Sequence, residues 1–325
     1  MKKLLFVIIV LHCSSMVFSQ SMFLNTEPAW SPDGEQIVFV SKRDGNDEIY
    51  VMNKDGSDLK RLTNTKADES DPGFSPDGNK ILFVSKRDKV SQIYIMDKDG
   101  SNQVNLTKTK KNESEPCWSP DGSKIAFQST RNATSQIYIM NSDGSNPKRV
   151  TKLTHNNSFP KWSPDGKKIL CTTIGSDGYK SSIIYLNDDN SDINLPFHTL
   201  YTLDCFSKDN KKVLGHLNHF GNSQSASDSL FIYDIDSRDL KIIPIDISDV
   251  LSAQFSINEE DFLVEANHNT YLIGIDGENK LTIQNGISAK YSPKEDLILC
   301  VTNDERMDVG TIKTDGTGFT NLTKD

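Results

Sequence analysis

The chain has 325 residues, and its 45 acidic against 36 basic side chains give a formal net charge of -9. It has no cluster of lysines and arginines long enough to follow a phosphate backbone, which argues against a nucleic-acid partner. Beyond the N-terminal segment, no apolar run approaches the roughly 20 residues that a transmembrane helix needs.

The N-terminal segment has the pattern of an export signal. Two lysines precede an apolar run over residues 4–11, and the small residues Val17 and Ser19 stand ahead of Gln20. This pattern predicts a signal peptide over residues 1–19 and a periplasmic or secreted mature protein. Cys13 suggests a lipoprotein anchor instead, but His12 stands before it, where a lipobox needs a small side chain, so cleavage is the favoured interpretation.

After this segment, one motif returns along the whole chain. It is an aromatic residue followed by Ser-Pro-Asp-Gly, whole or worn, and its serines are Ser31, Ser75, Ser119, Ser163, Ser207, Ser256 and Ser292. The successive spacings of 44, 44, 44, 44, 49 and 36 residues match the period of a four-stranded propeller blade. The sequence therefore predicts an all-β, seven-bladed β-propeller of four-stranded antiparallel blades as a single domain over residues 20–325, with six blades as the alternative.

Local chemistry supports this reading. Proline, aspartate and glycine suit successive positions of a β-turn, and a second turn such as Asp55-Gly56 follows in most repeats. The apolar runs over 37–40 and 49–52 are typical of strands buried on both faces. Because the last repeat contains a fourth strand of its own over 319–323, we expect the ring to close by apolar packing of the last blade on the first.

The large and sulfur-containing side chains fit a packed core. We expect the three tryptophans of the motif to be buried between blades; they are Trp30, Trp118 and Trp162. Two pairs of cysteines occupy equivalent positions in different repeats: Cys117 with Cys205, and Cys171 with Cys300. The blades of each pair are not neighbours, so the two sulfur atoms would be too far apart for a disulfide. All four are therefore expected to be small core residues.

The two faces of the predicted ring differ. The Ser-Pro-Asp-Gly and Asp-Gly turns would share one face, which we call the lower face. The connection between the second and third strands of each blade and the link to the next blade would share the other, the upper face. Repeat five has the longest such connection, and variable loops on a rigid scaffold often carry binding sites. His216, His219 and Phe220 are therefore candidate contacts for a partner.

Charged residues also recur in the first three repeats. Acidic residues precede the prolines, and arginines follow the second strands; the acids are Glu27, Asp71 and Glu115, and the arginines Arg43, Arg87 and Arg131. The favoured interpretation is a structural ion pair repeated around the ring. Otherwise the three arginines would form a charged rim that contacts the partner.

The sequence offers little for catalysis. Gly221-Asn222-Ser223 lacks the second glycine of a nucleophile elbow. The possible metal ligands are His155, His198, His216, His219 and His268, of which only two are close in sequence. We therefore predict no catalytic residue, no metal and no cofactor; the alternative is a propeller lyase or hydrolase with a metal bound by loop histidines.

The repeats resemble a known family. The unit acid-Pro-x-Trp-Ser-Pro-Asp-Gly, followed by Ile-Tyr-x-Met and Asp-Gly-Ser, resembles the WD40-like PD40 repeats of the TolB β-propeller family from Glu27 to Asp325, most strongly in repeats one to four. The resemblance implies a propeller that binds proteins at one face or at the channel mouth. We therefore expect an exported, monomeric, non-catalytic propeller that binds another envelope or exported protein or peptide at its upper face.

Overall fold

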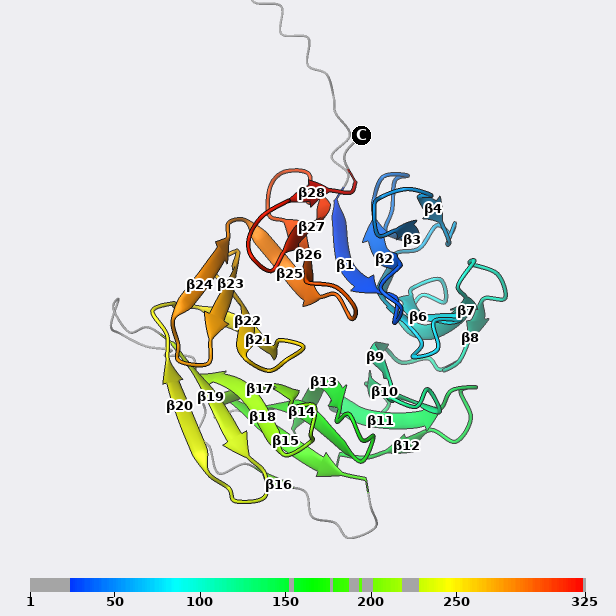
Figure 1. Cartoon of the computed structure of the whole chain (residues 1–325). Coiled ribbons are helices and arrows are strands. Elements are labelled where there is room, and N and C mark those ends of the chain that lie inside the picture. Colours follow the sequence, from blue (N-terminus) through cyan, green and yellow to red (C-terminus); the bar gives the residue numbers. More distant parts are fainter. Residues whose placement is uncertain are drawn as a thin grey trace, which may run out of the picture.

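The computed structural model describes residues 24–151, 155–175, 178–186, 193–194, 201–217 and 228–323. These residues form seven four-stranded antiparallel sheets arranged as a ring (Figure 1). The seven-bladed, all-β prediction is confirmed, and the six-bladed alternative is wrong. The predicted signal peptide over residues 1–19 lies outside the described residues.

Figure 1 shows the first strands around the centre of the ring and the fourth strands at its perimeter. The first strands are β1 (Asn25–Trp30), β5 (Glu69–Phe74), β9 (Glu113–Trp118), β13 (Asn156–Trp162), β17 (Tyr201–Phe206), β21 (Val250–Phe255) and β25 (Gly286–Tyr291). The second strands are β2 (Gln36–Ser41), β6 (Lys80–Ser85), β10 (Lys124–Ser129), β14 (Lys168–Gly175), β18 (Lys212–Leu217), β22 (Asp261–Ala266) and β26 (Leu297–Thr302).

The outer half of each blade completes the sheet. The third strands are β3 (Glu48–Asn53), β7 (Gln92–Asp97), β11 (Gln136–Asn141), β15 (Gly178–Tyr185), β19 (Ser229–Asp234), β23 (Asn269–Gly274) and β27 (Val309–Lys313). The fourth strands are β4 (Lys60–Arg61), β8 (Val104–Asn105), β12 (Lys148–Arg149), β16 (Ile193–Asn194), β20 (Leu240–Pro244), β24 (Asn279–Ile283) and β28 (Thr320–Asn321). Among the described residues, no helix is long and apolar enough to cross a membrane.

The turn motif connects the first and second strands as its composition predicts. The Ser31 hydroxyl donates to the Asp33 carboxylate at 2.6 Å and accepts the backbone N–H of Gln36 at 2.9 Å. Gly34 occupies the left-handed region with φ 74°. Where glycine is lost in repeat five, Asn210 keeps the same conformation with φ 64°, so the turn survives the worn sequence.

The core lies between the blades rather than within one layer. Each of the seven interfaces between neighbouring blades holds its own apolar cluster of buried side chains from both blades. Between blades 1 and 2, for example, Val38 and Ile49 pack with Phe83 and Met96. The second and third strands are thus buried on both faces, as predicted, and each blade depends on its neighbours for its core.

The ring closes without a shared strand among the described residues. Strand β28 pairs within blade 7, and blades 7 and 1 join through an apolar cluster that includes Phe39, Met52, Leu299 and Val301. The backbone N–H of Asn25 also donates to the Met307 carbonyl at 3.2 Å. Closure by packing of blade 7 on blade 1 is therefore confirmed for the part of the chain that the structure describes.

Two expectations about single side chains have different outcomes. The four cysteines among the described residues form no disulfide, as expected. The motif tryptophans, in contrast, are only partly buried, although each packs against an interblade cluster. Trp118 and Trp162 donate their indole N–H groups to the backbone carbonyls of Gly73 and Cys117, at 3.4 and 3.2 Å, whereas the Trp30 N–H has no such partner among the described residues.

Candidate binding site in the central channel

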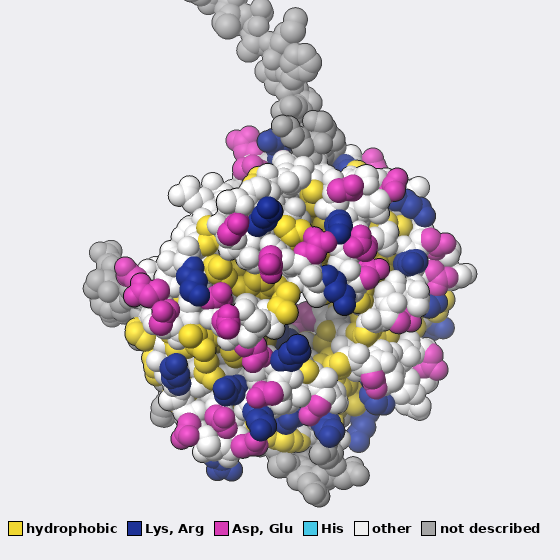
Figure 2. Space-filling model, in the orientation of Figure 1, with side chains coloured by type: hydrophobic (Ala, Val, Ile, Leu, Met, Phe, Trp, Pro, Cys, Tyr) yellow, Lys and Arg dark blue, Asp and Glu magenta, His cyan; other side chains and the backbone are white. Residues whose placement is uncertain are grey.

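The first strands of all seven blades enclose a central channel. A cavity of about 550 Å³ is lined by residues from each of them, including Glu27 and Asp71 on one side and Lys161 and Lys290 on others. Figure 2 shows this hollow at the centre of one face, with acidic and basic side chains at it. The channel is therefore the concave surface on which charged groups from different blades meet.

A bulge in each first strand aims charged side chains into this channel. In blades 1 to 3 the register shifts within the first strand, and the bulged residues Glu27, Asp71 and Glu115 adopt left-handed φ values of 53°, 52° and 52°. A bulge reverses the alternation of side chains along a strand. The acidic residues Glu27 and Asp71 thus line the channel cavity, and Glu115 lies next to Asp71.

The three carboxylates form a chain of hydrogen bonds that runs from blade to blade. The Glu27 carboxylate accepts the backbone N–H of Asp71 at 2.5 Å. The Asp71 carboxylate in turn accepts the N–H of Glu115, and the Glu115 carboxylate accepts the N–H of Phe159 at 2.5 Å. Each bond satisfies the N–H of a left-handed residue in the next blade, so these acids have a structural role besides any binding role.

The protein around the channel shifts the pKa values of these groups. Desolvation by the surrounding protein, and then the charge of Asp71, raise the pKa of Glu27. Desolvation also raises the pKa of Asp71, and it raises the pKa of Glu115 to about 7. In blade 7, next to Glu27 of blade 1, desolvation lowers the pKa of Lys290. These side chains touch solvent in the channel, but protein on all sides limits their hydration.

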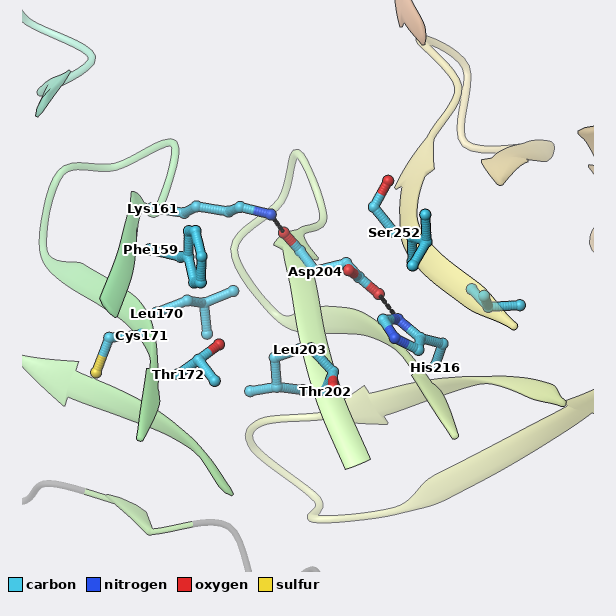
Figure 3. Close-up of a pocket in the computed structure, with 12 residues that line it drawn as sticks. Phe159, Lys161, Leu170, Cys171, Thr172, Thr202, Leu203, Asp204, His216 and Ser252 are labelled. Carbon is cyan, nitrogen blue, oxygen red and sulfur yellow. Dashed lines mark hydrogen bonds and ion pairs between the residues drawn. The ribbon is translucent and has the colours of Figure 1, made fainter. Parts of the chain in front are cut away.

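An apolar pocket of about 510 Å³ opens from the channel between blades 4, 5 and 6 (Figure 3). Its wall includes Phe159, Leu170, Leu203 and Leu251. Phe159 is 55% exposed and Leu251 is 63% exposed, although both are large apolar side chains. An exposed apolar surface inside a concave site is a common mark of a binding pocket.

Polar groups frame this pocket. Lys161 extends across Phe159, and its ammonium donates to the backbone carbonyl of Asp204 at 2.6 Å (Figure 3). The Asp204 carboxylate binds His216 Nδ1 at 2.7 Å, and both side chains are buried. His216, predicted as a surface contact, therefore lies in the pocket wall and is held by a carboxylate, which fixes the orientation of its ring.

The predicted arginines occupy another part of the fold. Arg87 Nη2 lies 3.1 Å from the carboxylate of Glu69, which is fully buried. Arg131 Nε repeats this contact with the buried Glu113 at 3.1 Å. A repeated ion pair exists, as favoured, but the prediction that the acids before the prolines supply it is wrong, because the bulge turns those acids into the channel.

Arg43 holds the equivalent place in blade 1, where its Nη2 donates to Asn25 Oδ1 at 3.2 Å. All three arginines also stack on aromatic rings, with guanidinium carbons 5.0, 4.4 and 5.0 Å from the ring centroids of Tyr50, Tyr94 and Tyr138. Bonding and stacking together hold these side chains against their own blades.

The predicted histidines do not gather. His155, His216 and His268 belong to blades 4, 5 and 6, and His198 lies outside the described residues, as do His219 and Phe220. Within the described part of the chain, no three His, Cys, Asp or Glu side chains come together in a group that could hold a metal ion.

Sequence reasoning missed Phe159, Lys161, Asp204 and Leu251. A signal for the first was present, because Phe159 stands four residues before a motif serine, where the earlier repeats carry an acid. The direction of these side chains depends on the bulge, however, and nothing in the residue order marks it.

Comparison with known proteins agrees with this architecture. A family model described as PD40, TolB beta propeller domain, matches residues 5–107 and 72–196, together more than half of the chain. The chain belongs to this PD40 family. No curated protein matches the PD40 chain.

Solved structures show the fold. TolB from Acinetobacter baumannii is 20% identical, with a TM-score of 0.55. The match covers 80% of the present chain and 63% of TolB, so the present chain spans less than two thirds of the length of TolB. The β-propeller domain of the Trilobed protease from Pyrococcus furiosus, reported with an open velcro topology, is 17% identical with a TM-score of 0.66, over 94% and 96%. An oligogalacturonate lyase in complex with manganese is 10% identical with a TM-score of 0.71, over 85% of both chains.

Proposed function

We propose that this chain is an exported, non-catalytic propeller that binds, as a monomer, another envelope or exported protein or peptide over the upper mouth of its channel. The observation that carries this proposal is the pair of exposed apolar side chains, Phe159 and Leu251, inside a concave pocket of about 510 Å³. Water is a poor solvent for such a surface, and a partner that covers it gains free energy.

The position of the pocket supports binding from the upper face. Thr202 pairs with His216 near the ends of β17 and β18, and the long connection over 218–228 leaves from this end of blade 5. Both residues line the pocket. The pocket thus lies at the end of blade 5 from which this connection leaves, and His219 and Phe220 remain proposed contacts.

Export and family support the rest of the proposal. The pattern over residues 1–19 is that of a signal peptide, and a PD40 propeller offers a rigid ring on which loops present a binding surface. A non-catalytic role is proposed because the sequence has no nucleophile elbow.

The test begins with a partner isolated in stoichiometric amount from the exported fraction. Residues 218–227 are then replaced by an Asn-Gly turn, with Asp228 kept because its carboxylate accepts the N–H of Val250 at 2.8 Å. The proposal predicts weaker partner binding at unchanged melting temperature. Ile257→Ser, on a turn of the lower face, is the matched control and should bind normally. Unchanged affinity in the loop variant, together with unchanged affinity in Phe159→Ser, would contradict the proposal.

A further inference from the structure

We propose that the pocket between blades 4, 5 and 6 receives a large apolar side chain of the partner and that a cationic group next to this side chain lies against the carboxylates of the channel. The inference rests on the proposed function and names the chemistry of its partner: a terminus or loop with an aromatic or aliphatic residue beside a lysine, an arginine or a chain-terminal amine.

The apolar half of this recognition depends on a departure from the repeat. Four residues before the motif serine, blades 1 to 3 carry acids and blades 6 and 7 carry Ser252 and Ser288, whereas blade 4 carries Phe159. Phe159 also has a left-handed φ of 57°, a conformation that bulky residues seldom adopt. A strained phenylalanine that stays 55% exposed in the channel is not explained by packing.

A second apolar side chain faces the same space. Leu251 stands at the bulge of β21, where the register shifts between Val250 and Ser252, and it is 63% exposed. Phe159 and Leu251 come from blades 4 and 6, with Leu203 of blade 5 in the wall that joins them. Two exposed walls and a buried floor can enclose one inserted side chain.

The cationic half follows from the charges beyond the pocket. The pocket and the channel cavity share Lys161, Asp204 and Ser252, so an occupant of the pocket emerges directly into the channel. The charged residues that line the channel cavity are Glu27, Asp71, Asp204 and Glu265, with Lys161 and Lys290, and the Glu115 carboxylate lies near Asp71. Among the described residues, none of these carboxylates is within ion-pair distance of an ammonium group.

The carboxylates oppose one another electrostatically. The charge of Asp71 raises the pKa of both Glu27 and Glu115, in addition to the larger effect of desolvation. A cation placed among them relieves this repulsion, whereas an anion adds to it. Charge complementarity therefore favours a basic rather than an acidic neighbour for the apolar side chain.

Three labelled seven-residue peptides of glycine and serine test the inference by fluorescence anisotropy with the mature protein. The first has a central phenylalanine flanked by lysines, the second has glutamates in place of the lysines, and the third has serine in place of the phenylalanine. We expect the first to bind at least about tenfold more tightly than either of the others.

Two variants locate the contacts. Phe159→Ser introduces the residue of blades 6 and 7 and should weaken binding of the first peptide by about tenfold. Glu27→Gln keeps an acceptor for the Asp71 N–H and should reduce the preference for lysine over glutamate. Ile242→Ser, at an exposed apolar residue of β20 outside the channel, is the control and should change neither value. Melting temperatures establish that each variant folds.

Several outcomes overturn the inference: equal affinity for the lysine and glutamate peptides, undiminished binding in Phe159→Ser, or no binding of any peptide. The isolated partner separates this failure from that of the proposed function. If the partner loses affinity when residues 218–227 are replaced but not in Phe159→Ser, the upper-face proposal stands and the pocket inference fails. If it loses affinity in neither variant, both fail.

Discussion

At the scale of single residues, the same acidic side chain meets two opposing demands in the channel wall. The Glu115 carboxylate accepts the backbone N–H of Phe159, which favours the charged form. Desolvation has the larger effect, however, and raises the pKa of Glu115 to about 7. The folded protein therefore holds a proton on Glu115 at pH values where the unfolded chain has released it.

This shift predicts a pH dependence of stability. Because the folded pKa is about 7 and the ordinary value is 4.5, the contribution of Glu115 is fully present below pH 4.5 and is lost as the pH rises through 7. Glu115→Gln keeps a carbonyl acceptor but cannot ionise. Its melting temperature should match that of the parent near pH 4.5 and exceed it increasingly towards pH 8. A constant difference across this range would contradict the assignment.

The arginine pairs predict a contrast between neighbouring residues. Arg87→Ala leaves the fully buried carboxylate of Glu69 without its cation and should cost about 2–3 kcal/mol of unfolding free energy. Lys86→Ala removes only a surface contact of 3.8 Å to Asp68 and should cost at most about 0.5 kcal/mol. Urea unfolding of both variants measures the difference, and equal losses would show that the Glu69 pair is not a structural one.

At the scale of elements, the Asp-Gly turns tie neighbouring blades together. A Cβ added to Gly100 would lie 2.9 Å from the Leu62 carbonyl oxygen of the preceding blade, and one added to Gly144 would lie 2.8 Å from that of Leu106. Gly56 of blade 1 repeats this approach to the carbonyl of Leu322 in blade 7 at 2.8 Å. The seam that closes the ring thus uses the same contact as the interior interfaces.

Gly56→Ala tests this seam. The new methyl group would meet backbone in blade 7, and alanine is strained at φ 85°, so we expect a loss of about 2–3 kcal/mol. Gly45→Ala is the matched control, because its φ of 116° is also strained but no atom lies within 4 Å of the added Cβ, and it should lose only about 1 kcal/mol. Equal losses of unfolding free energy in the two variants would mean that the Gly56 turn does not contact the backbone of blade 7.

The elements also show which features a sequence can reveal. The Ser-Pro-Asp-Gly turn was predictable because its residues are chosen for local φ and hydrogen bonding, as at Ser31 and Asp33. The channel site was not, because the direction of Glu27 depends on a bulge in β1 that shifts its register against β2. Residue order places Glu27 and Phe159 at equivalent positions, but only the closed ring places them around one space.

At the scale of the whole molecule, the ring divides into two parts. Blades 1 to 3 repeat the same arginine stacks and place carboxylates in the channel, whereas blades 4 to 6 line the adjoining apolar pocket with Phe159, Leu203 and Leu251. Uniform repeats supply a rigid frame, and the irregular blades supply an apolar wall opposite the acids. Binding is therefore expected on the irregular side of the channel.

Site-directed photocrosslinking shows on which side of the ring the partner lies. A benzophenone-bearing phenylalanine analogue is placed either at Phe159 in the channel or at Ile257 on a lower-face turn, and each protein is irradiated with the isolated partner. Both original side chains are exposed, 55% and 50%, so the two sites differ in location rather than in accessibility. We expect a covalent adduct from position 159 and none from position 257. An adduct from position 257 with none from position 159 would contradict this expectation.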